Sequence, residues 1–383
     1  MSVIYRRLET QLIHAGELRP RILGAIAMPI FQTAMGESTG GDYNDLPYIR
    51  LSNTPNHTVL AAKLAALEGA ESALVTASGM AAISTTLLTL LSAGDHLLAQ
   101  SSLYGGTHDF LTQDFPRLAL ASDFIDADAP QTWQAALRPT TKAIYVEAMS
   151  NPLLQVGDLK AIARFAREHG ILAIIDSTFA TPVNFRPLEI GFDLVIHSAT
   201  KYLNGHSDIV GGVVAGSAPH IERIRHRLNH YGGSMDPHAA FLLHRGLKTL
   251  ALRVRWQNES ALAIAHFLED HPRITQVNYP GLASHPRHER ARELFTGSGG
   301  MLSFELEGGA DAAAALLARV TLPALAPSLG GVETLMTRPA VTSHAGMSPQ
   351  ERERAGIRDN LIRMSVGLEA TEDLIDDLRQ ALA

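Results

Sequence analysis

The sequence has 383 residues, 46% of them hydrophobic and 19% charged, which is typical of a globular chain with a sizeable core and disfavours disorder. Its formal net charge of −7 and the lack of a long basic run disfavour a nucleic-acid partner. The absence of cysteine excludes disulfide frameworks, thiolate nucleophiles and cysteine-ligated zinc.

The N-terminal segment, residues 1–45, has weak periodicity and several glycines and prolines, so we expect an extended arm. Its first residues, MSVIYRRLETQLIH, carry charge and no apolar core, and we therefore expect no signal peptide. The rhythm of the remaining chain changes at about residue 235. We expect a large α/β domain over 46–235, a C-terminal α+β domain over 236–383, and a cytoplasmic protein.

Residues 72–94 contain no charged side chain, and a segment of this length could cross a membrane. The segment also holds eight serine or threonine residues, which suit lipid poorly. A strand, a turn at Ser78-Gly79 and a buried helix explain it better. The free N–H groups at the start of that helix would attract a phosphate group, although a simple tight turn explains these two residues equally well.

Three short apolar runs each lead into polar residues, as expected of parallel strands that are buried on both faces. These are 143–146 before Glu147, 171–175 before Asp176, and 194–196 before the patch Ser198–Lys201. Residues 158–170, between the first two runs, have apolar residues at helical spacing. The pattern predicts an α/β fold with a mostly parallel sheet and flanking helices. Ligands bind at the carboxyl ends of such strands, so the three polar groups should converge on one site.

Lys201 is the most informative residue of this predicted site. A lysine at the mouth of a buried strand is partly desolvated, which lowers its pKa and makes the amine nucleophilic. This amine, the Asp176 carboxylate, and hydroxyls beside a phosphate site are what pyridoxal phosphate (PLP) requires. The carboxylate would keep the pyridine nitrogen protonated, so that the ring withdraws electrons from an amino acid. The alternative is a surface lysine and an aspartate that caps a turn.

Beyond residue 235, strands and helices mix without a regular alternation. Helical spacing covers 240–271, 310–320 and 372–383, and strand patterns cover 301–306 and 361–367. The run 301–306 alternates as a half-exposed strand does. No metal site is expected, because the 17 histidines lack a His-Glu-x-x-His spacing.

The segment SATKYLNGHSDIVGG, residues 198–212, resembles the lysine signature of the Cys/Met-metabolism (transsulfuration) family of fold-type I PLP enzymes. Further stretches that match in family order are YIRLSN, SGMAAI, LYGGT, DSTFATP, RGLKTLALRV, YPGLASHP, SLGGVETL and LIRMSVG. The resemblance runs over nearly the whole chain. It implies an aminotransferase-like fold, PLP as cofactor, a small amino-acid substrate, and a homotetramer built as a dimer of dimers.

Most site residues follow from this resemblance. It implies that Lys201 carries PLP as a Schiff base, that Asp176 pairs with the pyridine nitrogen, and that Tyr104 stacks on the ring and acts as acid or base. The other implied cofactor contacts are Ser78, Gly79, Met80, Ser198 and Thr200 around the phosphate, Asn151 at the phenolic oxygen, Glu147 and Thr178 near the ring, and Tyr48 and Arg50 from a neighbouring subunit. The implied substrate contacts are Arg363 at the α-carboxylate, Asn151 and Ser328.

The family resemblance also implies a chemistry. The substrate amine displaces Lys201, the freed lysine moves the α-proton, and a second proton loss at Cβ lets a γ-substituent leave. The type that we favour is a cystathionine γ-lyase-like carbon–sulfur lyase. The alternative is γ-replacement on an activated homoserine ester, as in cystathionine γ-synthases, and further alternatives are methionine γ-lyase, cystathionine β-lyase and a non-catalytic scaffold.

Three positions depart from the family pattern. SNTPN at 52–56 interrupts a Gly-Asn-Pro-Thr pattern, Pro327 stands where many cystathionine γ-lyases and bacterial γ-synthases carry glutamate, and Gly106 stands where methionine γ-lyases carry cysteine. The proline removes a partner for a distal substrate amine, and the run Ala-Pro-Ser is similar to plant-type cystathionine γ-synthases. The sequence therefore predicts the reaction class and leaves the substrate open.

Overall fold

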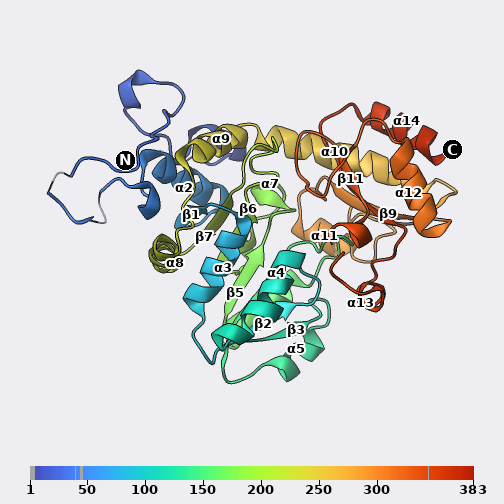
Figure 1. Cartoon of the computed structure of the whole chain (residues 1–383), viewed down its shortest axis with the longest axis horizontal. Coiled ribbons are helices and arrows are strands. Elements are labelled where there is room, and N and C mark those ends of the chain that lie inside the picture. The colour runs from blue at the N-terminus through green and yellow to red at the C-terminus, as the bar shows by residue number, and fades with distance from the viewer. Residues whose placement is uncertain (1–4, 39, 44–45, 344) are drawn as a thin grey trace.

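Two β-sheets organise the chain, a larger one from its first half and a smaller one near the C-terminus (Figure 1). The structure is a computed structural model that describes residues 5–38, 40–43, 46–343 and 345–383. The strands of the larger sheet are β1 Ser72–Thr76, β2 His96–Gln100, β3 Ala121–Ile125, β4 Thr141–Glu147, β5 Leu172–Asp176, β6 Leu194–Ser198 and β7 Gly212–Gly216. Those of the smaller sheet are β8 Ile274–Asn278, β9 Met301–Leu306, β10 Ala324–Leu325, β11 Leu335–Thr337 and β12 Leu361–Ser365.

The larger sheet has the strand order β1-β7-β6-β5-β4-β2-β3. β7 runs antiparallel to both of its neighbours, and the pairs from β6 to β3 are parallel. The smaller sheet has the order β10-β11-β12-β9-β8 and is antiparallel except for the pair β10–β11. The predicted α/β fold, with a mostly parallel sheet and a second, smaller α+β part, is confirmed.

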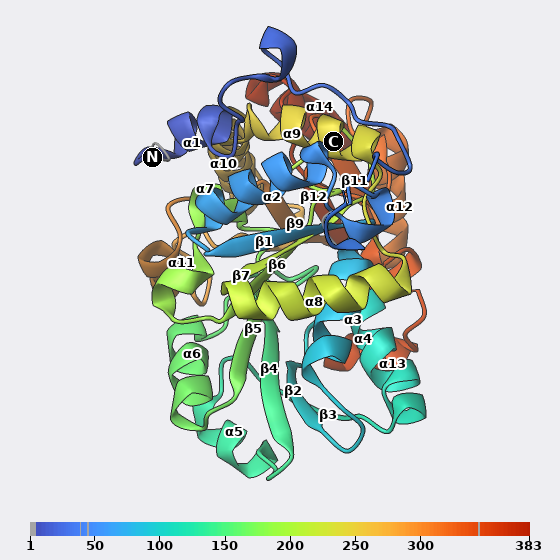
Figure 2. The ribbon, with the colours of Figure 1, turned by 90° about the vertical axis from the view of Figure 1, so that its left-hand side faces the viewer.

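Helices cover both faces of the larger sheet (Figure 2). In chain order the helices are α1 Leu8–His14, α2 Pro55–Glu68, α3 Gly79–Leu90, α4 Gly105–Asp109, α5 Pro130–Ala136, α6 Leu159–Glu168, α7 Thr181–Asn184, α8 Ala218–Tyr231, α9 Pro237–Leu247, α10 Leu250–Glu269, α11 His288–Leu294, α12 Gly309–Arg319, α13 Pro349–Arg354 and α14 Thr371–Leu382. α2, α6 and α9 share cores with one face of the sheet, and α3 and α8 share a core with the other. The carboxyl ends of the parallel strands stay uncovered by these helices and point toward the smaller sheet (Figure 1).

The strands that carry the predicted site lie where the apolar runs place them. α6 connects β4 to β5, and it begins at Asp158, whose carboxylate accepts the Ala161 N–H at 3.0 Å. The helix ends before Gly170, which has a φ of 63° that favours glycine. Leu159 and Ile162 are buried against the sheet, and each such side chain contributes roughly 1.5–3 kcal/mol of transfer free energy.

Residues 72–94 form β1, a turn and α3, as the sequence predicts. Their lack of charge reflects burial inside the protein, because both faces of β1 and the inner side of α3 lie in apolar cores. Within the described ranges, no helix is long and apolar enough to cross a membrane.

Part of the N-terminal segment, which we expect to be an extended arm, is helical. Leu8–His14 form α1, which packs on α2 with Leu12 buried. Just after the helix, Glu17 lies 3.5 Å from the buried ammonium group of Lys63. The helix is stabilised by these tertiary partners, which local periodicity over seven residues does not reveal. Residues 1–4, 39, 44 and 45 of the predicted arm lie outside the described residues.

The alternating strand β9 is buried on both faces, whereas the sequence predicts a half-exposed strand. Leu302 and Phe304 face α10, α12 and α14 in the core of the smaller sheet. The polar residues of the opposite face are covered as well: Ser303 bonds Asn278, and Glu305 pairs with Arg358. The polar residues of this alternating strand are therefore buried and paired rather than exposed to solvent. Their partners are distant in sequence, so the pattern alone does not reveal the burial.

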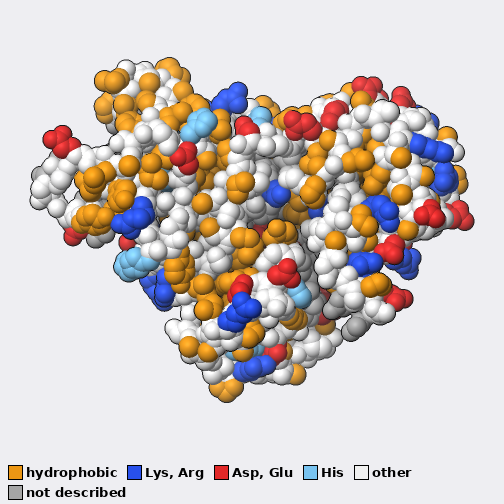
Figure 3. All heavy atoms as spheres, viewed as in Figure 1, with side chains coloured by type: hydrophobic (Ala, Val, Ile, Leu, Met, Phe, Trp, Pro, Cys, Tyr) orange, Lys and Arg blue, Asp and Glu red, His pale blue; other side chains and the backbone are white. Residues whose placement is uncertain are grey.

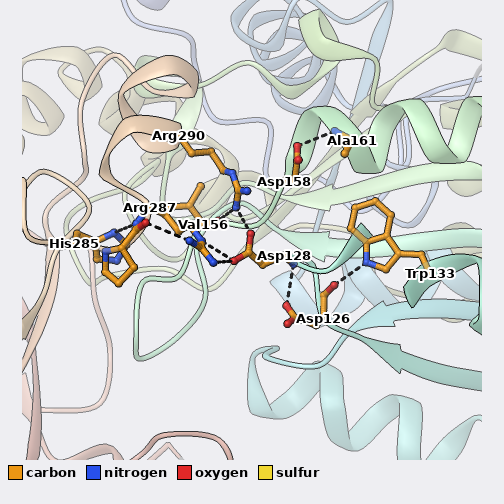
Figure 4. Close-up of polar contacts among 10 residues, drawn as sticks. Asp126, Asp128, Trp133, Val156, Asp158, Ala161, His285, Arg287 and Arg290 are labelled. Carbon is orange, nitrogen blue, oxygen red and sulfur yellow. Dashed lines mark hydrogen bonds and ion pairs between the residues drawn. The ribbon is translucent and has the colours of Figure 1, made fainter. Parts of the chain in front are cut away.

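Ion pairs join the two parts of the molecule beside the open edge of the larger sheet (Figure 4). Asp128, in the turn after β3, binds the guanidinium groups of Arg287 and Arg290 at α11. Arg290 also donates to the carbonyl oxygen of Val156 at 3.0 Å, in the loop that follows Asn151. A cavity of about 400 Å³ lies next to this cluster. The contacts fix the loop that carries one of the predicted substrate-binding residues.

Candidate active site

Two carboxylates stand side by side at the carboxyl ends of β4 and β5. Glu147 and Asp176 are direct neighbours in the strand register. Burial raises the pKa of Asp176, and hydrogen bonds from Thr178 and the charge of His197 oppose this rise. Burial raises the pKa of Glu147 well above its usual range, and the negative charge of Asp176 raises it further. Of the two groups, Asp176 is therefore the one suited to hold a negative charge.

Glu147 serves as an anchor for the loop that carries Tyr104. Its carboxylate accepts the backbone N–H of Tyr104 at 2.6 Å, and its own N–H donates to Gln100 Oε1 at 3.0 Å. The Tyr104 side chain is 49% exposed and extends over Gly106. A Cβ at position 106 would lie 2.7 Å from Tyr104 Cε1, so a side chain there would displace the ring. The missing side chain at Gly106 thus leaves room for the tyrosine.

The N-terminus of α3 points into the same region from β1. Ser78 caps the helix by accepting the Ala81 N–H at 3.0 Å. The first amides of a helix, here those of Gly79 and Met80, have no intrahelical acceptor and favour an anion. A Cβ on Gly79 would lie 2.9 Å from Ser198 Cβ, so only glycine lets the helix start approach the end of β6 so closely.

A chain of hydrogen bonds connects Asp176 with the end of β6. Asp176 Oδ1 accepts the Thr178 N–H at 2.9 Å, and Thr178 Oγ1 accepts the Ser198 N–H at 2.8 Å. The hydroxyl of Thr200 lies 3.0 Å from the Gly211 N–H, which donates to it. The structure therefore brings together the predicted residues of β1, β4, β5 and β6 at one edge of the sheet.

Lys201 lies in the turn after β6, and its ammonium group donates to Ser328 Oγ at 2.9 Å. Burial lowers the pKa of Lys201, and the positive charge of Arg363 lowers it further. This is the desolvation that the sequence predicts for a lysine at a strand mouth. A larger fraction of the amine is consequently neutral near pH 7 than for an exposed lysine.

Arg363, on β12 of the smaller sheet, faces Lys201 from the other side. It is 3% exposed, and burial lowers its pKa to about 10. The guanidinium donates to Asn151 Oδ1 at 3.1 Å and to the carbonyl oxygens of Pro327 and Ser328. No carboxylate is among these acceptors, so the cation is held in place by neutral groups. A guanidinium in this state is suited to bind the carboxylate of a ligand with two parallel hydrogen bonds.

Tyr48 and Arg50 are separate from the other predicted site residues. Arg50 donates to the carbonyl oxygen of Asn229 at 3.1 Å and to the Tyr43 hydroxyl at 2.9 Å, and it stacks over the Tyr48 ring at 5.1 Å. Of the residues that it contacts, Asn229 lies on α8, and Tyr43 and Tyr48 precede α2. Among the described residues of one chain, the contacts of these two side chains therefore do not include the groups around Lys201.

The structure adds Arg253, which the sequence reasoning missed. It is 4% exposed on α10 and donates to the carbonyl oxygens of Tyr202 at 2.8 Å and of Gly246 at 2.9 Å. Burial lowers its pKa to about 10. The arginine thereby fixes the backbone immediately after Lys201. Arg253 lies in the stretch RGLKTLALRV, which matches the family, and this match could have drawn attention to it. Its partner Tyr202 lies 51 residues away in sequence, so the contact itself could not be inferred from local sequence.

The described part of the chain contains no group of three or more histidine, cysteine, aspartate or glutamate side chains that could hold a metal ion.

Comparisons with known proteins identify the class. Residues 9–383 match the family model described as Cys/Met metabolism PLP-dependent enzyme. The chain is 41% identical to cystathionine gamma-lyase of Bacillus subtilis over 376 residues, which are 98% of each protein. It is 40% identical to L-methionine gamma-lyase of Porphyromonas gingivalis over 385 residues, covering 97% of this chain and 96% of the relative. It is also 41% identical to cystathionine beta-lyase MetC of Bacillus subtilis over 377 residues, covering 98% and 96%.

The protein is thus a PLP-dependent enzyme of the lyase type. It belongs to the Cys/Met metabolism family, as the sequence motifs predicted, and acts in sulfur-amino-acid metabolism. The residues present fit the cofactor: a desolvated amine at Lys201, a partly buried carboxylate at Asp176, and a helix start at Gly79, where the absence of a side chain leaves space beside Ser198.

Proposed function

We propose that the protein is a cystathionine γ-lyase-type enzyme that cleaves a carbon–sulfur bond by γ-elimination. The observation that carries this proposal is the hydrogen-bonded group of Lys201, Ser328, Arg363 and Asn151. It places an amine that can move a proton next to a cation that can bind an α-carboxylate. The similarity to a cystathionine gamma-lyase and an L-methionine gamma-lyase supports a reaction at the γ-carbon, but the similarity to a cystathionine beta-lyase is equally high, so β-elimination is an alternative that the product assay must separate.

When bound, PLP supplies an electron sink for negative charge at the substrate α-carbon. Lys201 would hold the cofactor, and Asp176 would keep a proton on its pyridine nitrogen. The start of α3 at Gly79 and Met80, together with Ser78, Ser198 and Thr200, would bind the phosphate. Asn151 and Thr178 would contact the ring.

Arg363 binds the substrate carboxylate and so aims the α-C–H bond at Lys201. The amine of Lys201, neutral in part because of its burial, accepts the α-proton and delivers it within the site. Tyr104, held by Glu147 and half-exposed, is placed to take or give a second proton. Ser328, the hydrogen-bond partner of Lys201, keeps the amine aimed between these proton transfers.

Position 327 bears on the choice of substrate. Pro327 contributes only its carbonyl oxygen to this region, and Arg363 occupies that oxygen. A distal ammonium group on the substrate would find no carboxylate at this position. The second candidate, γ-replacement on a homoserine ester, draws its support from this feature, because such an ester carries no distal amine.

A product assay separates the two candidates. We expect the enzyme to convert cystathionine into 2-oxobutanoate, ammonia and cysteine, because water completes an elimination when no thiol enters the site. The same assay with O-acetylhomoserine and cysteine should give 2-oxobutanoate in excess over cystathionine. Cystathionine as the main product would instead establish γ-replacement, and pyruvate with homocysteine would establish β-elimination.

We further propose that Tyr48 and Arg50 complete the phosphate site of a neighbouring subunit in a homotetramer. Within the part of the chain that the structure describes, Arg50 contacts Asn229, Tyr43 and Tyr48 rather than the groups around Lys201, which supports this sharing. Exposed apolar residues on the projecting N-terminal segment support association: Leu23, Ile26 and Met35 are 102%, 77% and 58% exposed. Figure 3 shows apolar side chains gathered over this segment. A surface of this kind is typical of a contact between subunits.

Mixing two inactive variants tests the shared site. We expect Arg50→Ala and Lys201→Ala to be inactive alone and to regain activity when their subunits are exchanged. In a symmetric dimer one site of each mixed pair contains both native residues, so roughly a quarter of the wild-type activity should return. A mixture of Lys201→Ala and Arg363→Ala is the control. Both residues serve the site of their own chain, so no mixed pair has a native site and this mixture should stay inactive. A mixture that exchanges subunits, as shown by mass spectrometry, yet stays inactive would contradict the proposal.

A further inference from the structure

The cavity of about 400 Å³ beside the ion-pair cluster lies in the seam between the two sheets. Its walls come from the carboxyl ends of β2 and β3 on one side, and from the segment before α11 and the smaller sheet on the other. None of its described lining residues is a predicted contact of the cofactor or the substrate. A single water needs only roughly 10–15 Å³, and small-molecule sites have roughly 300–1,000 Å³. The cavity is therefore large enough for a small molecule.

Two buried side chains of this lining have nitrogen atoms that form no hydrogen bond within the protein. Gln100 is 4% exposed; its Oε1 accepts the Glu147 N–H, and its Nε2 has no hydrogen-bond partner among the described residues. His285 is 7% exposed; its Nδ1 accepts the Arg287 N–H at 3.2 Å, and its Nε2 likewise has no described partner. Neither nitrogen is completely enclosed by protein atoms. Both are therefore available to a molecule in the cavity that the two side chains line.

The free nitrogen of His285 is a hydrogen-bond donor. Because Nδ1 accepts a hydrogen bond, a neutral ring carries its proton on Nε2. Burial, and after it the charges of His288 and Arg287, lower the pKa of His285 to about 4, so the ring is neutral near pH 7. The amide of Gln100 also donates through Nε2. The cavity thus has a donor without an acceptor on each wall, which is unfavourable unless water or a ligand accepts the bonds.

The charged groups of the cavity include one carboxylate that is not neutralised. Asp128 is paired with Arg287, and Glu305 is paired with Arg358. Asp126 accepts the Asp128 N–H at Oδ1 over 2.8 Å, and it has no ion-pair partner among the described residues. A cation in the cavity would therefore be attracted to Asp126, and a simple anion would be repelled by it.

The unpaired carboxylate stands beside one of the free donors. Gln100, the last residue of β2, is opposite Ile125, the last residue of β3, and Asp126 follows directly. His285 belongs to the other wall, before α11, and Figure 4 shows it at the same ion-pair cluster as Asp126. A ligand that fits must accept hydrogen bonds from N–H groups and present a cation to a carboxylate. An α-amino acid has both groups, because it is a zwitterion near neutral pH.

We propose that this cavity is a second binding site of the enzyme, for a free α-amino acid. Gln100 and His285 donate hydrogen bonds to oxygen atoms of the ligand, and Asp126 pairs with its ammonium group. The inference goes beyond the γ-elimination proposed above and does not rest on it.

A ligand at this site would contact the supports of two active-site loops. Gln100 holds the Glu147 N–H through Oε1, and the Glu147 carboxylate holds the Tyr104 N–H. The other loop carries Asn151, and its residues 153 and 155–157 line the cavity. Occupancy of the site should therefore change turnover, so the site is suited to regulation of the enzyme by an amino acid.

Binding can be measured on the holoenzyme after borohydride reduction, which fixes the cofactor and prevents its reaction with an added amino acid. The probes are radiolabelled L-serine, L-glutamine and L-methionine. Equilibrium dialysis up to about 10 mM nearly saturates a site whose dissociation constant is about 1 mM. We expect at least one probe to bind once per chain, and to bind equally to Arg363→Met, which lacks the active-site carboxylate contact. No binding of any probe, or binding that Arg363→Met abolishes, would overturn the proposal.

Asp126→Asn removes the charge and keeps the size of the side chain and its hydrogen bond to the Asp128 N–H. We expect the dissociation constant of the bound probe to rise about tenfold or more, because hydrogen bonds between charged groups are much stronger than neutral ones. Asp95→Asn is the matched control. Asp95 precedes β2 at the opposite end of the strand, and its Oδ2 accepts the Ser92 N–H at 2.8 Å. Equal dissociation constants for the two variants would contradict a role of Asp126.

Propionate tests the chemical class of the ligand, because it has a carboxylate and no ammonium group. We expect it to displace the bound probe at least about tenfold less well than the same unlabelled amino acid does. Equal displacement would show that the cavity binds anions in general and not a zwitterion. All these measurements are made without turnover, so their outcome is independent of the product assay for γ-elimination.

Discussion

Replacing Lys201 with alanine is expected to remove the visible absorbance band of the bound cofactor and to lower turnover by about 10³-fold or more. The amine both attaches the cofactor and moves the α-proton, and proton transfer by a positioned side chain alone contributes roughly 10²–10⁴-fold. Absorbance spectroscopy of the purified protein and the release of 2-oxobutanoate measure the two effects. The desolvated amine and its contact with Ser328 are the basis of this expectation.

Lys160→Ala provides the control for the loss of a lysine. Lys160 lies on α6, its side chain is 53% exposed, and it pairs with Glu293 at 3.7 Å. A surface pair of this kind contributes little, so colour and turnover should stay at the wild-type level. If the Lys201→Ala protein keeps its yellow colour and its turnover, Lys201 is not the residue that carries the cofactor.

Replacing Arg253 with methionine is expected to lower the free energy of unfolding by about 3 kcal/mol, because it leaves buried carbonyl oxygens without donors at roughly 1–3 kcal/mol each. The oxygens belong to Tyr202, Leu203 and Gly246. Tyr202 and Leu203 directly follow Lys201 in the sequence, so we also expect the variant to retain the cofactor less tightly. Urea denaturation with fluorescence detection gives the change in unfolding free energy at constant m-value.

Arg255→Met is the matched control, two residues further along α10. The Arg255 side chain is 51% exposed and pairs with Glu9 on the surface. Its replacement should change the unfolding free energy by no more than about 0.5 kcal/mol. Equal losses for the two variants would mean that the carbonyl contacts of Arg253 do not stabilise the turn after Lys201.

The framework of the site could be predicted from local sequence. Apolar runs that end in Glu147, Asp176 and the Ser198–Lys201 patch indicate parallel strands whose carboxyl ends meet, and the strand register confirms that they do. This inference works because a strand buried on both faces leaves an unbroken apolar run in the sequence. Burial of Lys201 follows from the same logic.

The groups that support this framework could not be predicted in the same way. Arg253 and Glu68 lie on helices and reach partners 51 and 129 residues away in sequence, and charged residues on a helix normally face solvent. For the same reason, the sequence suggested a half-exposed β9, although Ser303 and Glu305 bond to groups across the sheet and in a neighbouring loop. The short α1 likewise depends on contacts with α2 rather than on its own pattern. Local periodicity does not contain these long-range pairings.

The most direct test is the location of the cofactor on the chain. Reduction of the holoenzyme with borohydride fixes the cofactor to the lysine that carries it, and peptide mass spectrometry then identifies that lysine. We expect a single modified peptide with the pyridoxyl group on Lys201, and no modification of Lys63, Lys160 or Lys248. A modified peptide that lacks Lys201, or a holoenzyme with no modified lysine, would contradict the site described here.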